Sequence, residues 1–173
     1  NDVTLPKISI IVPAYNEENT IKKTLESISK LRYPKHLLQT YVVNDGSTDN
    51  TKQVIKTYIA NKTQFTLVSH DNMGKAASMN KVLNMIDSPY FLCLDADSYV
   101  EPESLETITK YFLQHNAENL AIVTPAMKVY QPKNWLQKIQ RFEYIVMLLF
   151  ARLASQMDSL YVAPGPFSMY KTS

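Results

Sequence analysis

The first 125 residues alternate short apolar runs with segments of helical character. Strands that alternate with helices of this length form right-handed βαβ units. The pattern therefore predicts an α/β fold in three layers, with a mostly parallel central sheet that helices cover on both faces. The predicted strands are residues 7–13, 39–43, 65–69, 90–94 and 120–125, and the predicted helices are residues 16–30, 50–60, 75–86 and 103–115.

Polar side chains follow four of the predicted strands, close to the point where each strand ends. In parallel sheets, ligands bind beyond the carboxyl ends of the strands, so these side chains are expected to converge on one edge. Capping needs only one small polar residue per helix, such as Asn16 before the first helix. The four junctions carry more than that, namely a tyrosine, a lysine and several carboxylates. They comprise residues 15–17, 44–46, 74–75 and 95–97.

Asp95 and Asp97 end the apolar run that begins at Tyr90. In an extended backbone, residues i and i+2 point to the same side, with their Cα atoms roughly 6.5 Å apart. That spacing suits one carboxylate that holds Mg²⁺ or Mn²⁺, completed by phosphate oxygens and water, and one that orients a neighbouring hydroxyl group. The alternative is that Asp97 and Ser98 cap a helix that begins near Glu101.

A nucleoside diphosphate sugar would match the chemistry expected at this edge. Tyr15 would stack on the base, Asp45 would accept the imide N–H of the base, and Asp95 would hold the ribose. Asp97 would bind the cation that bridges both phosphates, and Lys75 would add positive charge beside them. Three of these side chains also have purely structural interpretations: Tyr15 packs over the helix start, Asp45 builds its own turn, and Lys75 is only solvated.

Composition argues against several classes of protein. The 173 residues are 45% hydrophobic, enough for one sizeable core, and the 18 basic and 16 acidic residues form no basic stripe that would bind nucleic acid. With only 3 glycines, neither the dinucleotide-binding motif G-x-G-x-x-G nor the P-loop can be written. The single cysteine, Cys93, lies inside a predicted strand and is interpreted as a core residue.

Four motifs in this order resemble the family 2 glycosyltransferases, which have the GT-A fold. They are Val12-Pro13-Ala14-Tyr15-Asn16-Glu17-Glu18, the run from Val43 to Thr51, Gly74-Lys75-Ala76 and Asp95-Ala96-Asp97. The resemblance implies inverting transfer of a sugar from a nucleoside diphosphate donor, commonly a UDP-sugar, with Mg²⁺ or Mn²⁺. It also implies a metal ligand at Asp97 and donor contacts at Pro13, Tyr15, Glu17, Asp45, Lys75 and Asp95.

The later part of the chain is similar to processive, membrane-embedded members of the family. Residues 138–144 and 164–171 resemble the chitin, hyaluronan, cellulose and poly-N-acetylglucosamine synthases. This implies a glycan or lipid acceptor and a place at the cytoplasmic face of a membrane. We expect residues 1–125 to form the donor-binding subdomain and residues 126–173 to begin the acceptor-side subdomain.

Two departures from the family pattern stand out. The family usually has Asp-Asp-Gly-Ser where this chain has Asn44-Asp45-Gly46-Ser47. The family's general base, an Asp beyond the turn that Gly165 occupies, and its Gln-x-x-Arg-Trp signature are missing after Lys171. The base is therefore expected beyond residue 173, in a missing C-terminal part with possible transmembrane helices. The chain alone is expected to bind donor weakly and to turn over poorly or not at all.

A long helix is predicted over about residues 133–157, with Asn134 as its cap. Its apolar stripe predicts either packing on the sheet or contact with a membrane. The longest apolar run, residues 144–151, is too short to cross a bilayer. A strand is also predicted at residues 127–130, and a strand, tight turn and strand at residues 160–170.

Two rival functions are consistent with parts of the sequence. Phosphatases of the haloacid dehalogenase type also use a strand that ends in Asp-x-Asp, and Asp95 would then be the nucleophile. Their motif normally continues with Thr or Val where this chain has Tyr99. The other rival is a non-catalytic module with the GT-A fold that binds a nucleotide or a partner protein.

Overall fold

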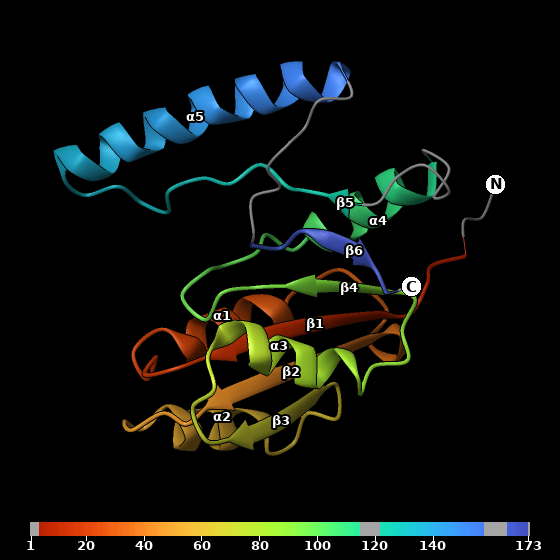
Figure 1. Ribbon diagram of the computed structural model, residues 1–173, viewed down its shortest axis with the longest axis vertical. Helices are drawn as coiled ribbons and strands as arrows, with labels where there is room; N and C mark the ends of the chain where they lie inside the picture. The colour runs from red at the N-terminus through yellow and green to blue at the C-terminus, as the bar shows by residue number, and fades with distance from the viewer. Residues whose placement is uncertain (1–3, 115–121, 158–165, 173) are drawn as a thin grey trace.

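Six strands form one sheet in the order β3-β2-β1-β4-β6-β5 (Figure 1). The computed structural model describes residues 4–114, 122–157 and 166–172. The strands are β1 (Ile8–Ala14), β2 (Leu38–Asp45), β3 (Phe65–His70), β4 (Tyr90–Cys93), β5 (Ile122–Val123) and β6 (Met169–Lys171). The helices are α1 (Ile21–Ser29), α2 (Thr51–Ile59), α3 (Lys75–Leu83), α4 (Ser104–Gln114) and α5 (Trp135–Gln156), with a short 3-10 helix η1 (Lys35–Leu37).

The sheet is mostly parallel, as predicted. β1 runs parallel to β2 and to β4, and β2 runs parallel to β3. β6 lies antiparallel to both β4 and β5. Because parallel neighbours end at the same edge of a sheet, the polar residues after β1, β2 and β4 are brought close together.

Alternate residues of β1 point into two separate hydrophobic clusters. Ile8, Ile10 and Val12 pack with apolar side chains of α1, α2 and α4. Ile11 faces the other side, where it joins Val82 of α3. Figure 1 shows α3 in front of the sheet, with α1 and α2 behind it. The predicted three-layer arrangement is therefore confirmed.

Three sequence predictions in the first and last thirds of the chain differ from the structure. Asn16 does not cap α1, because the helix begins at Ile21 and the Asn16 backbone has a positive φ of 55°. Residues 127–130 form no strand, since no described strand lies beside them, although Tyr130 packs edge-on against Tyr99. Of the predicted strand at 120–125, Ile122–Val123 is confirmed as β5, residues 124–125 form no strand, and residues 120–121 lie outside the described residues. Of the strand, turn and strand at 160–170, the first strand and most of the turn lie outside the described residues.

The helix predicted near residues 133–157 is α5, and it begins with a capping box. The Gln137 N–H donates to Asn134 Oδ1 at 2.9 Å, and Gln137 Oε1 accepts the Asn134 N–H at 3.4 Å and the Lys133 N–H at 2.7 Å. Figure 1 shows α5 set apart from the sheet. Its apolar stripe is not covered by any described element, so the predicted packing on the sheet is wrong. None of the helices in the described ranges is both long enough and apolar enough to span a membrane.

Candidate nucleotide-sugar site

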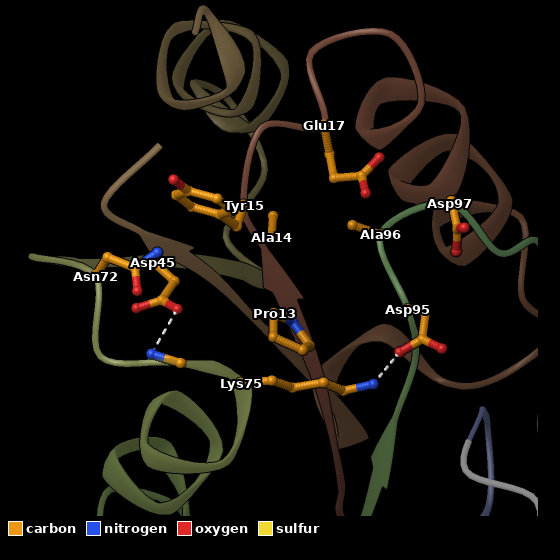
Figure 2. A pocket seen from close by; sticks show the side chains of 11 residues that line it. Pro13, Ala14, Tyr15, Glu17, Asp45, Asn72, Lys75, Asp95, Ala96 and Asp97 are labelled. Carbon is orange, nitrogen blue, oxygen red and sulfur yellow. Dashed lines mark hydrogen bonds and ion pairs between the residues drawn. The ribbon is translucent and has the colours of Figure 1, made fainter. Parts of the chain in front are cut away.

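One cleft of about 370 Å³ lies at the carboxyl edge of the sheet, where β1, β2 and β4 end (Figure 2). It contains all seven residues that the sequence assigned to donor or metal binding. The loop before α3 closes one side of the cleft, and the turn after β4 closes the other. The lining residues are Pro13, Ala14, Tyr15, Glu17, Asp45, Asn72, Gly74, Lys75, Asp95, Ala96 and Asp97.

The turn that carries the two aspartates is held by one backbone hydrogen bond and one from a side-chain hydroxyl. The Leu94 N–H donates to the Ile11 carbonyl at 2.9 Å, which continues the parallel pairing of β4 with β1. The Thr24 hydroxyl of α1 donates to the buried Ala96 carbonyl at 2.7 Å. Because Ala96 stands between the two aspartates, α1 fixes the position of both carboxylates at the cleft.

Asp97 lies at the rim of the cleft with an exposed side chain. α4 begins only at Ser104, and the Ser104 N–H donates to the Glu101 carbonyl instead of to a side chain near Asp97. Within the described residues, the only hydrogen bond to the Asp97 carboxylate comes from the Ser98 hydroxyl, at 3.4 Å. The capping alternative is therefore wrong, and the carboxylate is directed to the cleft.

Lys75 and Asp95 form an ion pair across the floor of the cleft (Figure 2). Lys75 is the first residue of α3, and the φ of +85° at Gly74 turns the chain into that helix. Partial burial would lower the pKa of the Lys75 ammonium, but the hydrogen bond and charge of Asp95 outweigh it and raise the pKa. Lys75 therefore remains a cation beside Asp95, rather than being only solvated.

Asp45 is buried, and its carboxylate joins the end of β2 to the loop before α3. Its two oxygens accept the N–H groups of Met73 at 2.8 Å and Gly74 at 3.0 Å. His70 Nδ1 lies 3.3 Å from Asp45 Oδ1. These bonds go to a neighbouring loop, so Asp45 does more than build its own turn. A carboxylate has about four lone-pair positions, so capacity remains for a ligand.

The segment after β1 lines the upper part of the cleft. The ring of Tyr15 is half-exposed and lies on the Asp45 side, away from Asp97 (Figure 2). Asn16 Oδ1 accepts the Thr48 N–H at 2.9 Å, which explains why Asn16 ties this segment to the loop after β2 instead of capping α1. The Glu17 N–H donates to Thr51 Oγ1 at 2.7 Å, so α2 fixes the position of Glu17 as well.

The cleft also contains residues that sequence reasoning did not single out. Ala14, Asn72 and Ala96 belong to motifs or loops already recognised, so their neighbours in the sequence were the available signal. His70 lies outside the cleft lining but contacts Asp45, and only the register of β2 with β3, which pairs Asp45 with His70, would have indicated this contact.

The donor atoms at the cleft suit a hard divalent cation that a phosphate ligand helps to bind. The described residues contain no group of three or more His, Cys, Asp or Glu side chains arranged to hold a metal ion. The carboxylates of Asp97 and Asp95 are nevertheless the oxygen ligands that Mg²⁺ and Mn²⁺ prefer. Magnesium typically takes only one or two protein carboxylates and completes its shell with substrate phosphates and water. The residues present therefore fit such an ion.

The profile of the family described as "Glycosyl transferase family 2" matches residues 9–173. The chain belongs to that family. The membership excludes the haloacid dehalogenase alternative for Asp95.

The curated relatives of this family 2 chain include two bacterial synthases. It is 30% identical over 168 residues to the poly-beta-1,6-N-acetyl-D-glucosamine synthase of Staphylococcus epidermidis, covering 96% of this chain and 40% of that protein. The corresponding synthase of Staphylococcus aureus (strain MSSA476) is 29% identical over 170 residues, covering 98% of this chain and 40% of that protein. The chain thus spans about 40% of the length of these relatives.

Solved glycosyltransferase structures share the fold of this family 2 chain, so the predicted GT-A fold is confirmed. The structure of S. aureus TarS 1-349 in complex with UDP-GlcNAc superposes with a TM-score of 0.65 and 28% identity, over 74% of this chain and 36% of that one. The mannosyltransferase PcManGT from Pyrobaculum calidifontis, solved with GDP-Man and Mn²⁺, gives a TM-score of 0.74 at 23% identity, over 98% of this chain and 47% of that one.

Proposed function

We propose that this family 2 glycosyltransferase chain binds a nucleoside diphosphate sugar, with UDP as the nucleotide, in the cleft at the carboxyl edge of the sheet. The observation that carries the proposal is the convergence of seven residues from four distant motifs on that one cleft. A relative by structure, TarS, was solved with UDP-GlcNAc, and the curated relatives are poly-N-acetylglucosamine synthases. Both support a UDP-sugar as donor.

The positions of the side chains suggest a direction for the donor along the cleft. The base would lie beside Tyr15 and Asp45, where the carboxylate can accept an imide N–H, and Pro13 and Glu17 would line its path. Asp95 and Lys75 lie further along, and Asp97 stands at the far rim (Figure 2). The ribose and the phosphates would follow in that order.

A divalent cation, Mg²⁺ or Mn²⁺, would be held by Asp97 with help from Asp95. When bound, it would neutralise charge on the diphosphate and so make the nucleotide a better leaving group. The Lys75 ammonium would add a second positive charge near the same oxygens. To do so it must exchange or share its partner Asp95, which then becomes available to the ribose or the metal.

The transfer step itself extends the proposal beyond the cleft. We place the donor-binding subdomain at residues 1–125 and the start of an acceptor-side subdomain at residues 126–173. Transfer would invert the sugar's anomeric configuration, and a general base beyond residue 173 would deprotonate a glycan or lipid acceptor. The relatives are longer than this chain, and the complete enzyme would act at the cytoplasmic face of a membrane.

Calorimetric titration with UDP, with and without Mn²⁺, tests the proposal. We expect binding to be stronger with the metal, and we expect Asp97→Ala to remove that gain. Asp87→Ala is the matched control, because this exposed aspartate pairs with Lys7 and lies outside the cleft. Equal binding with and without metal would rule out the role given to Asp97.

Release of UDP from UDP-GlcNAc distinguishes an enzyme from a binding module. We expect slow release or none by the chain as given, because we place the general base beyond residue 173. Metal-dependent binding with no release, even when the missing part of the enzyme is supplied, would favour the non-catalytic alternative.

A further inference from the structure

His70 is the last residue of β3, and it lies directly beside Asp45, the last residue of β2. The parallel register of the two strands pairs these residues. Both side chains are only 6% exposed, and His70 Nδ1 lies 3.3 Å from Asp45 Oδ1. A buried imidazole therefore contacts the one cleft carboxylate that we place against the base of the donor.

The hydrogen bonds of His70 fix the orientation of its ring. Nδ1 lies 2.8 Å from the carbonyl oxygen of Asp71, and a carbonyl oxygen can only accept. Nδ1 must therefore carry a proton, which it shares between the Asp71 carbonyl and the Asp45 carboxylate. Nε2 is buried and has no hydrogen-bond partner within the described part of the chain. The ring is thus oriented through Nδ1 alone.

Asp45 connects the oriented imidazole to the loop before α3, which closes one side of the cleft. Its oxygens also accept the N–H groups of Met73 and Gly74, and Lys75 follows immediately. The loop lies so close to β2 that a Cβ on Gly46 would be 2.4 Å from the Asn72 nitrogen. The imidazole, the carboxylate and the loop therefore form one tightly packed unit at the base end of the cleft.

We propose that His70 is a positioning residue that selects uracil through Asp45. Its Nδ1–H and the two backbone N–H groups occupy part of the carboxylate's hydrogen-bonding capacity and hold the carboxylate in one rotamer. The remaining lone pair then faces the cleft and accepts the imide N–H of uracil. This inference rests on the proposed function, because it assumes that the base of the donor lies beside Asp45.

CDP, whose base is cytosine, is the ligand that tests this selectivity for uracil. Its N3 carries no proton in the neutral base, so it presents a lone pair to the carboxylate instead of a donor. An oriented carboxylate therefore favours UDP over CDP, whereas a carboxylate free to rotate loses part of that preference. A residue that only supports the fold would change the affinities for both nucleotides together.

The experiment measures the affinities of UDP and CDP, each with Mn²⁺, for the native chain and for two variants of His70. His70→Leu and His70→Gln both lack a donor at the position of Nδ1, and Gln keeps a polar group where Nε2 stands. We expect each variant to lose about tenfold in UDP affinity, the effect of about one charge-assisted hydrogen bond, and less than about threefold in CDP affinity. The control is His36→Leu, since His36 is exposed on η1 and should change neither affinity.

His70→Asn provides the rescue. Its amide nitrogen falls near the position of Nδ1, so we expect it to recover most of the preference for UDP. Equal loss of UDP and CDP affinity in the Leu and Gln variants, or an unchanged UDP to CDP ratio in the Gln variant, would overturn the inference. A native chain that binds neither nucleotide would instead overturn the proposed function.

Discussion

The cleft half of the molecule, residues 4–114, and helix α5 are both rich in apolar residues. These residues are buried in the cleft half and exposed on α5. In the cleft half, Leu25 of α1, Leu92 of β4 and Phe112 of α4 are almost completely buried in one cluster. On α5, Phe142, Leu149 and other large apolar side chains are more than half exposed. The comparison shows that apolar periodicity predicts a helix, and that only the neighbouring elements decide whether its apolar face is buried.

The same difference explains where the candidate site lies. A carboxylate or ammonium can be held in a defined place only if the backbone that carries it is fixed. In the cleft half, the buried hydroxyl of Thr24 fixes Ala96, and the side chain of Thr51 fixes Glu17. At the start of α5, the capping box joins only Lys133, Asn134 and Gln137 and connects the helix to no other element. Four experiments would break or sharpen this contrast.

Shortening one leucine in each region should give the largest difference. Leu92→Ala removes a completely buried side chain next to β1 and should lower the free energy of unfolding by about 3 kcal/mol. Leu149→Ala, on the exposed side of α5, should change it by less than about 0.5 kcal/mol. Urea unfolding followed by circular dichroism measures both. A loss of more than about 2 kcal/mol for Leu149→Ala would show that α5 is packed after all.

The two described glycines with positive φ form a second pair, and both lie in the cleft half. A Cβ at Gly46 would meet the Asn72 backbone, and its φ is +67°, so Gly46→Ala should cost about 2 to 3 kcal/mol. Gly74 has open space around it, but its φ of 85° and ψ of 157° lie in a region that essentially only glycine adopts, so Gly74→Ala should lower the free energy of unfolding by about 2 kcal/mol through backbone strain alone. A loss of only about 1 kcal/mol for Gly46→Ala in urea unfolding, the strain of its φ alone, would show that the Asn72 backbone does not crowd Gly46.

Asp49 should make a smaller contribution to the free energy of unfolding, and that contribution should depend on pH. Burial would raise the pKa of its carboxyl, but hydrogen bonds from Thr51 and from the Glu18 N–H outweigh it and lower the pKa. A lowered folded-state pKa contributes stability above the unfolded-state pKa of about 4, and that contribution is lost as the pH falls through the folded-state value. Because Asp49 is partly exposed, the contribution is screened by solvent.

Asp49→Ala should therefore cost about 1 kcal/mol at pH 7, as loss of a helix cap does, and less near pH 3. Asn50→Ala is the matched control, because Asn50 precedes α2 but makes no side-chain cap hydrogen bond. Thermal unfolding at both pH values measures the difference between the variants. A cost for Asp49→Ala that does not change with pH would mean that its charge has no part in the cap.

The strands and the lining of the cleft could be predicted from the sequence because both depend on patterns among neighbouring residues. Apolar runs predicted β1 to β4 to within about a residue or two at each end, and the polar residues after them converge on one edge because parallel strands share a direction. The ion pair of Lys75 with Asp95 and the contact of His70 with Asp45 were not predicted. Both join residues at least 20 positions apart, and side-chain geometry rather than pattern decides them.

The wrong predictions have the same origin. Asn16 before two glutamates has the sequence of a helix cap, but its side chain has a better partner in the Thr48 N–H, which the sequence does not place nearby. Residues 127–130 have the composition of a strand, yet a strand needs a neighbour. In the described part of the chain these residues pair with neither edge strand of the sheet, β3 or β5, and their composition alone could not indicate that.

The smallest expected change is in the fluorescence of Trp135, the only tryptophan. It begins α5 and is 68% exposed. If the comparison holds, its fluorescence should resemble that of indole in water, and iodide should quench it nearly as well as free tryptophan. UDP should leave this emission almost unchanged, because the cleft does not include α5. Fluorescence titration at low protein concentration measures both effects. A blue-shifted emission that iodide cannot quench would place Trp135 in an apolar contact, and α5 would then share the packed character of the cleft half.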